Sequence, residues 1–263
     1  MDMKKMRFFL LICMQLLGHL LFSSELDCYL LPLEHPISDK LQQLFNDPSR
    51  IENLDYWLER GFIVENFDES CREWSILVLS HPQIPDYVFK KNYNSSDPQI
   101  ELQNYRARIE GASLIAKYIR LMHCKHLAVP QKWLYCLPSL EGSIDRSVLI
   151  CEKFNLIPGG YWGGPNKELY ASMNREVMQE LVRALYDLCG CDAWPQNLPF
   201  MENGCIAFID TEHVGLSYGD FFRLLPFINP LLTDEAMKIW DDLCQTRTPW
   251  FLCQPSKEVD LER

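Results

Sequence analysis

The spacing of hydrophobic and polar residues changes several times along this chain. Between residues 61 and 91, apolar residues gather in three short β-rich runs, at 62–65, 74–79 and 87–91. Runs of this kind, separated by turn residues, predict successive antiparallel strands. From 98 to 122 the apolar residues recur at spacings of three and four, which predicts one long amphipathic helix. Two more strand-like runs follow, at 133–137 and 147–151.

Helical spacing dominates the remainder of the chain. Short helices are predicted at 39–45 and 50–59, ahead of the strands, and further helices at about 166–188, 218–225 and 234–243, the first of them long. The helix at 166–188 is expected to end at Gly190, a residue suited to a left-handed cap. The turn Glu202-Asn203-Gly204 separates the apolar runs 198–201 and 205–209, a strong hairpin signal. A mostly β half is therefore followed by a mostly helical half.

The first 24 residues are predicted to lie outside the fold. Lys4, Lys5 and Arg7 precede an apolar run that reaches Phe22, and a small polar pair, Ser23-Ser24, ends the segment. This order is typical of a secretory signal peptide, and the apolar run is short for a membrane span of ~20 residues. Phe22 stands where a small residue is preferred before a cut after Ser24, so an uncleaved membrane anchor remains an alternative. We expect a secreted chain or one held in a secretory lumen.

The composition of the chain argues against some classes of function. The chain has 263 residues, 25 Lys and Arg against 36 Asp and Glu, and a formal net charge of −11. Such a chain repels phosphate backbones and anionic lipid, which argues against nucleic-acid binding. Its length suits one large domain or two lobes. Of the eleven cysteines, ten remain if the segment holding Cys13 is removed, and an even number in an exported chain permits disulfides, although a buried thiol is the commoner interpretation of Cys151.

Three polar side chains suggest chemistry. Asp192 and Asn197 lie in a loop after the long C-terminal helix, and Asp210 ends the apolar run at 205–209. Two carboxylates and a carboxamide suit Mg²⁺ bound to a triphosphate, because the hard cation prefers oxygen ligands. Asp192 would then be available to accept a hydroxyl proton. The alternative is structural: Asp192 and Asn197 stabilise a turn, and Asp210 only terminates a strand.

The loop that contains Asp192 resembles a known pattern. It reads Gly190-Cys191-Asp192-Ala193-Trp194-Pro195-Gln196-Asn197 and is similar to the H-G-D-x-x-P-x-N loop of the aminoglycoside and choline phosphotransferases, within the protein-kinase-like superfamily. Upstream, Tyr87-Val88-Phe89-Lys90 is similar to the third-strand V-A-I-K motif of that superfamily. The segment Asp210-Thr211-Glu212 stands in the place of its metal-binding D-F-G or D-x-E motif.

The resemblance implies an α+β, two-lobed fold. Its N-lobe, at 61–154, would hold a five-stranded antiparallel sheet with one long helix, and its C-lobe, at 155–263, would be small and mostly helical. Residues 25–60 would form a helical extension. The implied cofactors are ATP and Mg²⁺. Lys90, with Lys91 as the alternative, would hold the phosphates and pair with Glu110, while Asp192 would be the catalytic base. The nucleotide base would lie against a hinge made of Glu152, Lys153 and Phe154, and Asn197 and Asp210 would hold the metal.

Departures from the pattern keep other functions open. Gly190 replaces the expected histidine, the connection at 66–73 contains no glycine, and only residues 211–263 follow Asp210, without an A-P-E sequence. Three hypotheses remain: an exported ATP- and Mg²⁺-dependent phosphotransferase with an unknown acceptor, a catalytically inactive pseudokinase that binds or scaffolds a partner protein, and a secreted structural protein stabilised by disulfides. Because ATP is scarce outside cells, delivery into another cell is a further hypothesis for an exported kinase.

Overall fold

The computed structural model describes residues 28–47, 51, 53–66, 76–92, 97–137, 146–157, 164–215 and 220–253. The segment 1–24, predicted to be a signal peptide or anchor, lies outside this set. Within the described ranges, no helix combines the length and the apolar character needed to cross a membrane.

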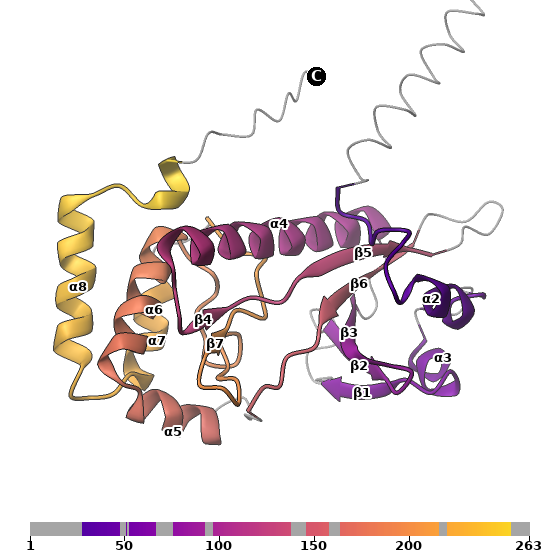
Figure 1. Ribbon diagram of the computed structural model, residues 1–263, viewed down its shortest axis with the longest axis horizontal. Coiled ribbons are helices and arrows are strands. Elements are labelled where there is room, and N and C mark those ends of the chain that lie inside the picture. The colour runs from indigo at the N-terminus through magenta and orange to yellow at the C-terminus, as the bar shows by residue number, and fades with distance from the viewer. Residues whose placement is uncertain are drawn as a thin grey trace, which may run out of the picture.

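A five-stranded antiparallel sheet forms one half of the molecule (Figure 1). Its strands in spatial order are β1 (Ile63–Asn66), β2 (Ile76–His81), β3 (Ile84–Asn92), β6 (Ser147–Glu152) and β5 (Lys132–Cys136). The predicted five-stranded sheet is thus confirmed, and the strand bounds agree with the expected ranges to within a few residues.

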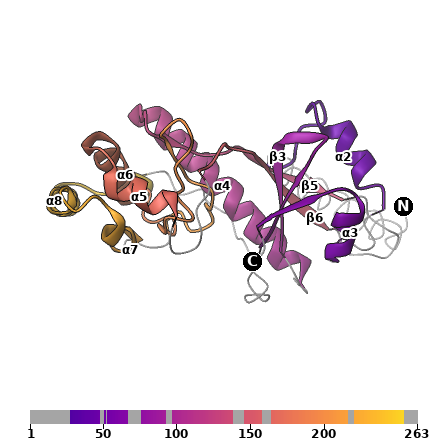
Figure 2. The same cartoon turned by 90° about the horizontal axis from the view of Figure 1, so that it is seen from below.

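Helices cover both faces of this sheet (Figure 2). The helices α2 (Ser38–Leu44) and α3 (Leu54–Glu59) pack on one face. There the Phe45 ring contacts both Phe89 of β3 and Trp57 of α3. The long helix α4 (Pro98–Met122) packs on the other face through Tyr105 and Ile109. Because side chains alternate along a strand, Phe89 faces the first pair of helices and Lys90 faces α4.

The bounds of α4 agree with the prediction, and local sequence explains them. Asp97 caps the N-terminus by accepting hydrogen bonds from the amides of Gln99 and Ile100, and Pro98 occupies the first turn, where its missing N–H costs nothing. The helix ends where His123 takes a left-handed conformation with φ 53°. This single helix spans the molecule from the sheet to the helical half (Figure 1).

The helical half differs from the prediction at one point. The expected helix at 166–188 is two helices, α5 (Pro165–Ser172) and α6 (Arg175–Asp187). The chain turns extended at Met173, and the Asn174 side chain then caps α6 by accepting a hydrogen bond from the Val177 amide. Periodicity alone did not reveal this cap within an otherwise helical pattern. The helix α6 also ends before Gly190, and Cys189, at φ 52°, takes the first left-handed position.

Two further helices and a small second sheet complete this half. The helices are α7 (Asp220–Leu224) and α8 (Thr233–Thr246), followed by a short turn, η3 (Trp250–Cys253). The predicted hairpin is present as a bridge between Phe200 and Ile206. Its second arm, β7 (Ile206–Ala207), also pairs in parallel with β4 (Leu127–Ala128), a contact that the sequence did not predict.

The cysteines give little support to a disulfide framework. Cys124, Cys151, Cys205, Cys244 and Cys253 are thiols in no disulfide, and Cys151 is buried within the sheet as its apolar surroundings predict. Cys71 lies outside the described residues.

Candidate functional site

The segment that follows β7 lies against the α4 face of the sheet. Two strand lysines hold it there: the Nζ atoms of Lys90 and Lys132 both donate to the Ile209 carbonyl, each at 3.1 Å. Strand register explains their convergence, since Val88 and Lys132 both lie opposite Cys151, on the same face as Lys90. The predicted Lys90 is therefore next to the segment that carries the predicted Asp210.

An arginine from α4 completes this contact. The guanidinium of Arg108 is buried and bridges two carboxylates, with NH1 2.9 Å from Asp210 Oδ1 and NH2 2.7 Å from Glu212 Oε2. We call Arg108, Lys90 and Lys132 the basic cluster. Burial alone would raise the pKa of Asp210, but the three charges of this cluster outweigh burial and hold the pKa below its ordinary value. Asp210 is therefore ionised and surrounded by cationic groups.

The third member of the cluster, Lys132, is fully enclosed. Its Nζ also donates to Thr211 Oγ1 at 2.7 Å. Burial, together with repulsion from Lys90, lowers the pKa of Lys132 to about 7, and the nearby charge of Asp210 opposes this only in part. Lys132 is thus close to half-charged at neutral pH.

Thr211 is the point of closest approach between this segment and α4. The residue is fully buried, and its hydroxyl donates to the Arg108 carbonyl at 2.5 Å. A Cβ atom on Gly111 would lie 1.8 Å from the Thr211 carbonyl oxygen, so only glycine fits there. The segment from Ile209 to Glu212 is therefore fastened to both the sheet and α4.

The predicted pairing of Lys90 with Glu110 is not made. The Glu110 carboxylate instead accepts a hydrogen bond from the Tyr29 hydroxyl, and the guanidinium of Arg106 lies over the Tyr29 ring. Successive helix residues are rotated by about 100°, which places Arg108 and Glu110 on nearly opposite faces of α4. An orientation that directs Arg108 toward Asp210 must turn Glu110 away from it.

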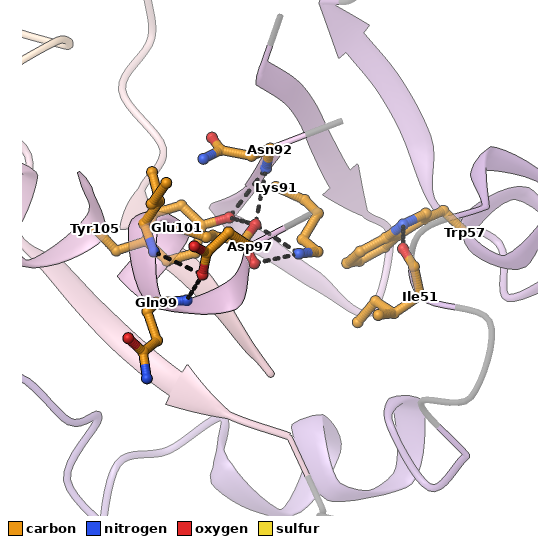
Figure 3. Close-up of polar contacts among 9 residues, drawn as sticks. Ile51, Trp57, Lys91, Asn92, Asp97, Gln99, Glu101 and Tyr105 are labelled. Carbon is orange, nitrogen blue, oxygen red and sulfur yellow. Dashed lines mark hydrogen bonds and ion pairs between the residues drawn. The ribbon is translucent and has the colours of Figure 1, made fainter. Parts of the chain in front are cut away.

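The ion pair that joins β3 to α4 involves the alternative lysine (Figure 3). Lys91 Nζ lies 2.5 Å from both carboxylate oxygens of Glu101, and both side chains are at most 3% exposed. The Tyr105 hydroxyl donates to the same carboxylate at 2.7 Å, and the Asn92 amide donates to the Tyr105 oxygen. Glu101 and Arg108 are seven positions apart, about two helical turns, so one face of α4 carries both ionic contacts.

The predicted catalytic loop forms a small network of its own. Asn197 Nδ2 donates to Asp192 Oδ2 at 2.8 Å and to its carbonyl at 3.1 Å, and Arg223 NH1 lies 2.8 Å from Asp192 Oδ1. The Ile209 amide donates to the Asn197 carbonyl, which ties this loop to the segment carrying Asp210. The structure thus brings Asp192, Asn197 and Asp210 to one region, with an arginine beside each aspartate.

The predicted hinge has partners within the chain. The amides of Glu152 and Lys153 donate to the carbonyls of Gln131 and Asp86, and the Glu152 carboxylate accepts from the Gln131 amide. The Lys153 ammonium pairs with Glu65 at 2.6 Å, while Phe154 is partly buried. Two amide donors of the hinge are therefore already engaged.

These contacts test the fit of Mg²⁺ and a triphosphate. A divalent cation at Asp210 would be a fourth positive charge near one carboxylate, and Arg108 NH1 already lies 2.9 Å from one of the two carboxylate oxygens. Among the described residues, no group of three or more His, Cys, Asp or Glu side chains is arranged to hold a metal ion. The nearby cationic groups therefore disfavour a metal ion at Asp210 in this arrangement.

Sequence reasoning missed four residues of this region: Arg108, Lys132, Glu101 and Arg223. The seven-residue spacing of Glu101 and Arg108 within an otherwise apolar helix face was a usable signal. No local pattern marked Lys132 or Arg223, because a lysine on a strand and an arginine on a short helix are commonly exposed to solvent.

Comparison with known proteins adds little. No protein-family model matches the chain, and no curated protein matches it. Among solved structures, it is similar to a MAP kinase from Leishmania major, at 11% identity over 74% of this chain and 72% of that chain, with a TM-score of 0.33. Likeness at this level carries no information about activity. The architecture itself, a five-stranded antiparallel sheet with helices, is a mixed α/β arrangement compatible with a protein-kinase-like fold.

Proposed function

We propose that this chain is an inactive, two-lobed kinase-like module that acts by binding a partner protein and does not transfer phosphate. The observation that carries the proposal is the ion pair of Arg108 with Asp210 and Glu212. A phosphotransferase of this kind needs the Asp210 carboxylate for Mg²⁺. Here the long helix supplies an arginine to that carboxylate, which neutralises the charge that would attract the metal.

Three other features support the proposal. The Lys90 ammonium hydrogen-bonds to the Ile209 carbonyl, Glu110 is engaged by Tyr29, and the Glu152 and Lys153 amides are used within the chain. Groups that would bind phosphate, fix the lysine or bind adenine therefore have other roles. A binding module also needs no ATP, which suits the proposed export of the chain by its first 24 residues.

A Mg²⁺-dependent phosphotransferase acting on an unknown acceptor is the second candidate. The observation that favours it is the Asp192–Asn197 pair, whose two hydrogen bonds hold a partly exposed carboxylate beside a carboxamide. In that function Asp192 would receive a hydroxyl proton, and Arg108 would have to leave Asp210. The two candidates make opposite predictions about metal.

Nucleotide binding with and without metal tests the proposal. The affinities of the wild-type chain for ADP and ATP are measured by calorimetry, first with EDTA and then with saturating MgCl₂, and phosphate release from labelled ATP is followed in parallel. We expect Mg²⁺ to change either affinity by less than about twofold, which corresponds to about 0.4 kcal/mol of binding free energy. We also expect no phosphate release above that of the Asp192→Asn variant.

The opposite result has a distinct signature. Tight nucleotide binding that requires Mg²⁺ and is lost in Asp210→Asn would refute the inactive module and support the second candidate. Phosphate release abolished by Asp192→Asn would do the same. Asp241→Asn is the matched control for the change in overall charge, because it makes the same substitution at an exposed aspartate of α8.

A further inference from the structure

The last described residues of the chain pack against the C-terminal end of α4. After α8, Arg247 is extended and the turn η3 follows, which Figure 1 shows in yellow next to the end of α4. Asp187, on α6, is 1% exposed and receives this segment: its carboxylate lies 2.7 Å from Arg247 NH2 and accepts from the Trp250 amide at 3.2 Å. The Tyr118 hydroxyl of α4 donates to the same carboxylate at 2.9 Å.

Aromatic contacts extend this attachment to α4. The Trp250 ring lies edge-on to Tyr118, with centroids 5.6 Å apart, and the Lys117 ammonium lies over Trp250 at the same distance. A buried carboxylate thus binds an arginine and an amide, while the surrounding aromatic surface binds the indole. Such pairs stabilise through both geometry and charge.

The same segment reaches the loop that follows Asp210. A Cβ atom on Gly215 would lie 2.3 Å from the Phe251 ring, so the ring packs directly on the glycine backbone. Gly215 has φ +86°, and its amide donates to the Leu188 carbonyl at 2.9 Å. The loop 211–215 is therefore held by Thr211 against α4 at one end and by Phe251 at the other.

We propose that residues 247–253 form a C-terminal strap that holds the loop 211–215 closed, so that release of the strap loosens the chain next to Asp210. Of the strap, α4 and the loop 211–215, the strap is the part that can open with the smallest loss of buried contacts. Its charged anchor is one buried carboxylate, beside a hydrogen bond from the Tyr186 hydroxyl to the Arg247 carbonyl and the partly buried Trp250. The Arg247 side chain is 38% exposed and Leu252 is 56% exposed. Segments with few buried contacts open locally without global unfolding. The proposal uses neither nucleotide nor metal, so it does not depend on the proposed function.

The direct test opens the strap and observes the loop. In the full chain, the double variant Arg247→Gln/Trp250→Ala removes the ionic and the aromatic anchor. Hydrogen exchange of the Gly215 amide, measured by NMR, reports the loop because that amide bonds to Leu188. We expect exchange about tenfold faster or more, the effect of losing one charge-assisted hydrogen bond and one aromatic contact. Leu252→Ala, a change to an exposed residue on the same segment, should leave the rate unchanged.

The reciprocal test disturbs the loop and observes the strap. Coupling between two sites acts equally in both directions, so Gly215→Ala must loosen the strap. Trypsin cleavage after Arg247 measures strap opening, and we expect it to be severalfold faster in Gly215→Ala. Gly204→Ala is the matched control, because Gly204 has a similar φ of +82° but no atom within 4 Å of the added Cβ.

The two tests give different results depending on whether the strap and the loop are coupled. Faster chymotrypsin cleavage after Phe251 in the double variant than in wild type, with unchanged exchange of the Gly215 amide, would show that the strap opens without affecting the loop and would overturn the proposal. Equal effects of Gly215→Ala and Gly204→Ala on cleavage would also overturn it, since backbone strain alone would then account for the change. A tenfold rise in exchange together with a cleavage difference between the two alanine variants supports it.

Discussion

At the scale of single residues, the region around Asp210 is defined by charge. The side chains of Lys90, Arg108 and Lys132 surround the Asp210 carboxylate and the Ile209 carbonyl. Removing one partner from such a buried group leaves the others with uncompensated charge, which is more costly than the pair itself is stabilising. Arg108 therefore has a structural role that constrains what Asp210 can do chemically.

The buried Lys132 should make folding stability depend on pH. Its pKa is about 7 in the folded chain and 10.5 in its ordinary state. Below pH 7 it is charged in both states and the burial penalty is complete. Between about 7 and 10.5 the unfolded chain binds a proton that the folded chain has lost, so the free energy of unfolding rises with pH, by up to about 1.4 kcal/mol per pH unit.

Urea denaturation of wild type and Lys132→Met across this range measures the effect. We expect the variant to lack that rise, so the difference in unfolding free energy between the two proteins should change steadily with pH. Lys238→Met, at an exposed position of α8, is the control and should follow wild type. A wild-type-to-variant difference that stays constant with pH would show that Lys132 does not titrate in this window.

At the scale of elements, α4 connects the two halves of the molecule. One face carries Glu101 toward Lys91 and Arg108 toward Asp210, and Gly111 allows close contact with Thr211. Because these residues share a face, the rotation of α4 that satisfies one contact also satisfies the others. This is why Glu110, on the opposite side, contacts the N-terminal Tyr29 instead.

A double-mutant cycle on Lys91 and Glu101 should reveal this coupling. Each side chain is nearly inaccessible, so Lys91→Met and Glu101→Met are each expected to lower the free energy of unfolding by about 3–5 kcal/mol, because a buried charge loses its partner. The double variant should be less destabilised than the sum of the singles, measured by urea denaturation. Strict additivity would mean that the two charges do not interact in the folded chain.

At the scale of the whole molecule, the described residues that precede β1 are part of the fold. Helices α2 and α3 bury Phe45 and Trp57 against the sheet, and Tyr29 and Leu31 exchange hydrogen bonds with Leu134 of β5. The sheet is therefore covered on both faces, by this extension on one side and by α4 on the other.

Truncating Trp57 tests whether the extension is essential to the core. The side chain is fully buried and its indole N–H donates to the Ile51 carbonyl at 2.9 Å. We expect Trp57→Ala to lower the free energy of unfolding by about 3–5 kcal/mol, through lost contacts and a cavity. Leu58→Ala, at a neighbouring position that is 48% exposed, should change it far less. Equal effects would place Trp57 outside the cooperative core.

The local elements of this protein could be predicted because their signals are local. The run of apolar residues from 98 to 122, with Asp97 before it, determined α4, and short β-rich runs determined the five strands. The break at Asn174 was missed because a cap within a continuous helical pattern competes only weakly with periodicity. The pairing of β4 with β7 was missed because two residues carry too little pattern to define a strand.

The amino-acid sequence by itself determined the order of the five sheet strands and of α4 along the chain, and the presence of Lys90, Asp192, Asn197 and Asp210 in that order. Only the tertiary structure decided their partners: Arg108 rather than Mg²⁺ beside Asp210, Lys91 rather than Lys90 in the ion pair with α4, and Tyr29 rather than a lysine at Glu110. Two physical reasons apply: the rotation of α4 about its axis turns Arg108 and Glu110 to opposite sides, and the alternation of side chains along β3 places Lys90 and Lys91 on opposite faces of the sheet. That rotation is set by the packing of the whole buried face.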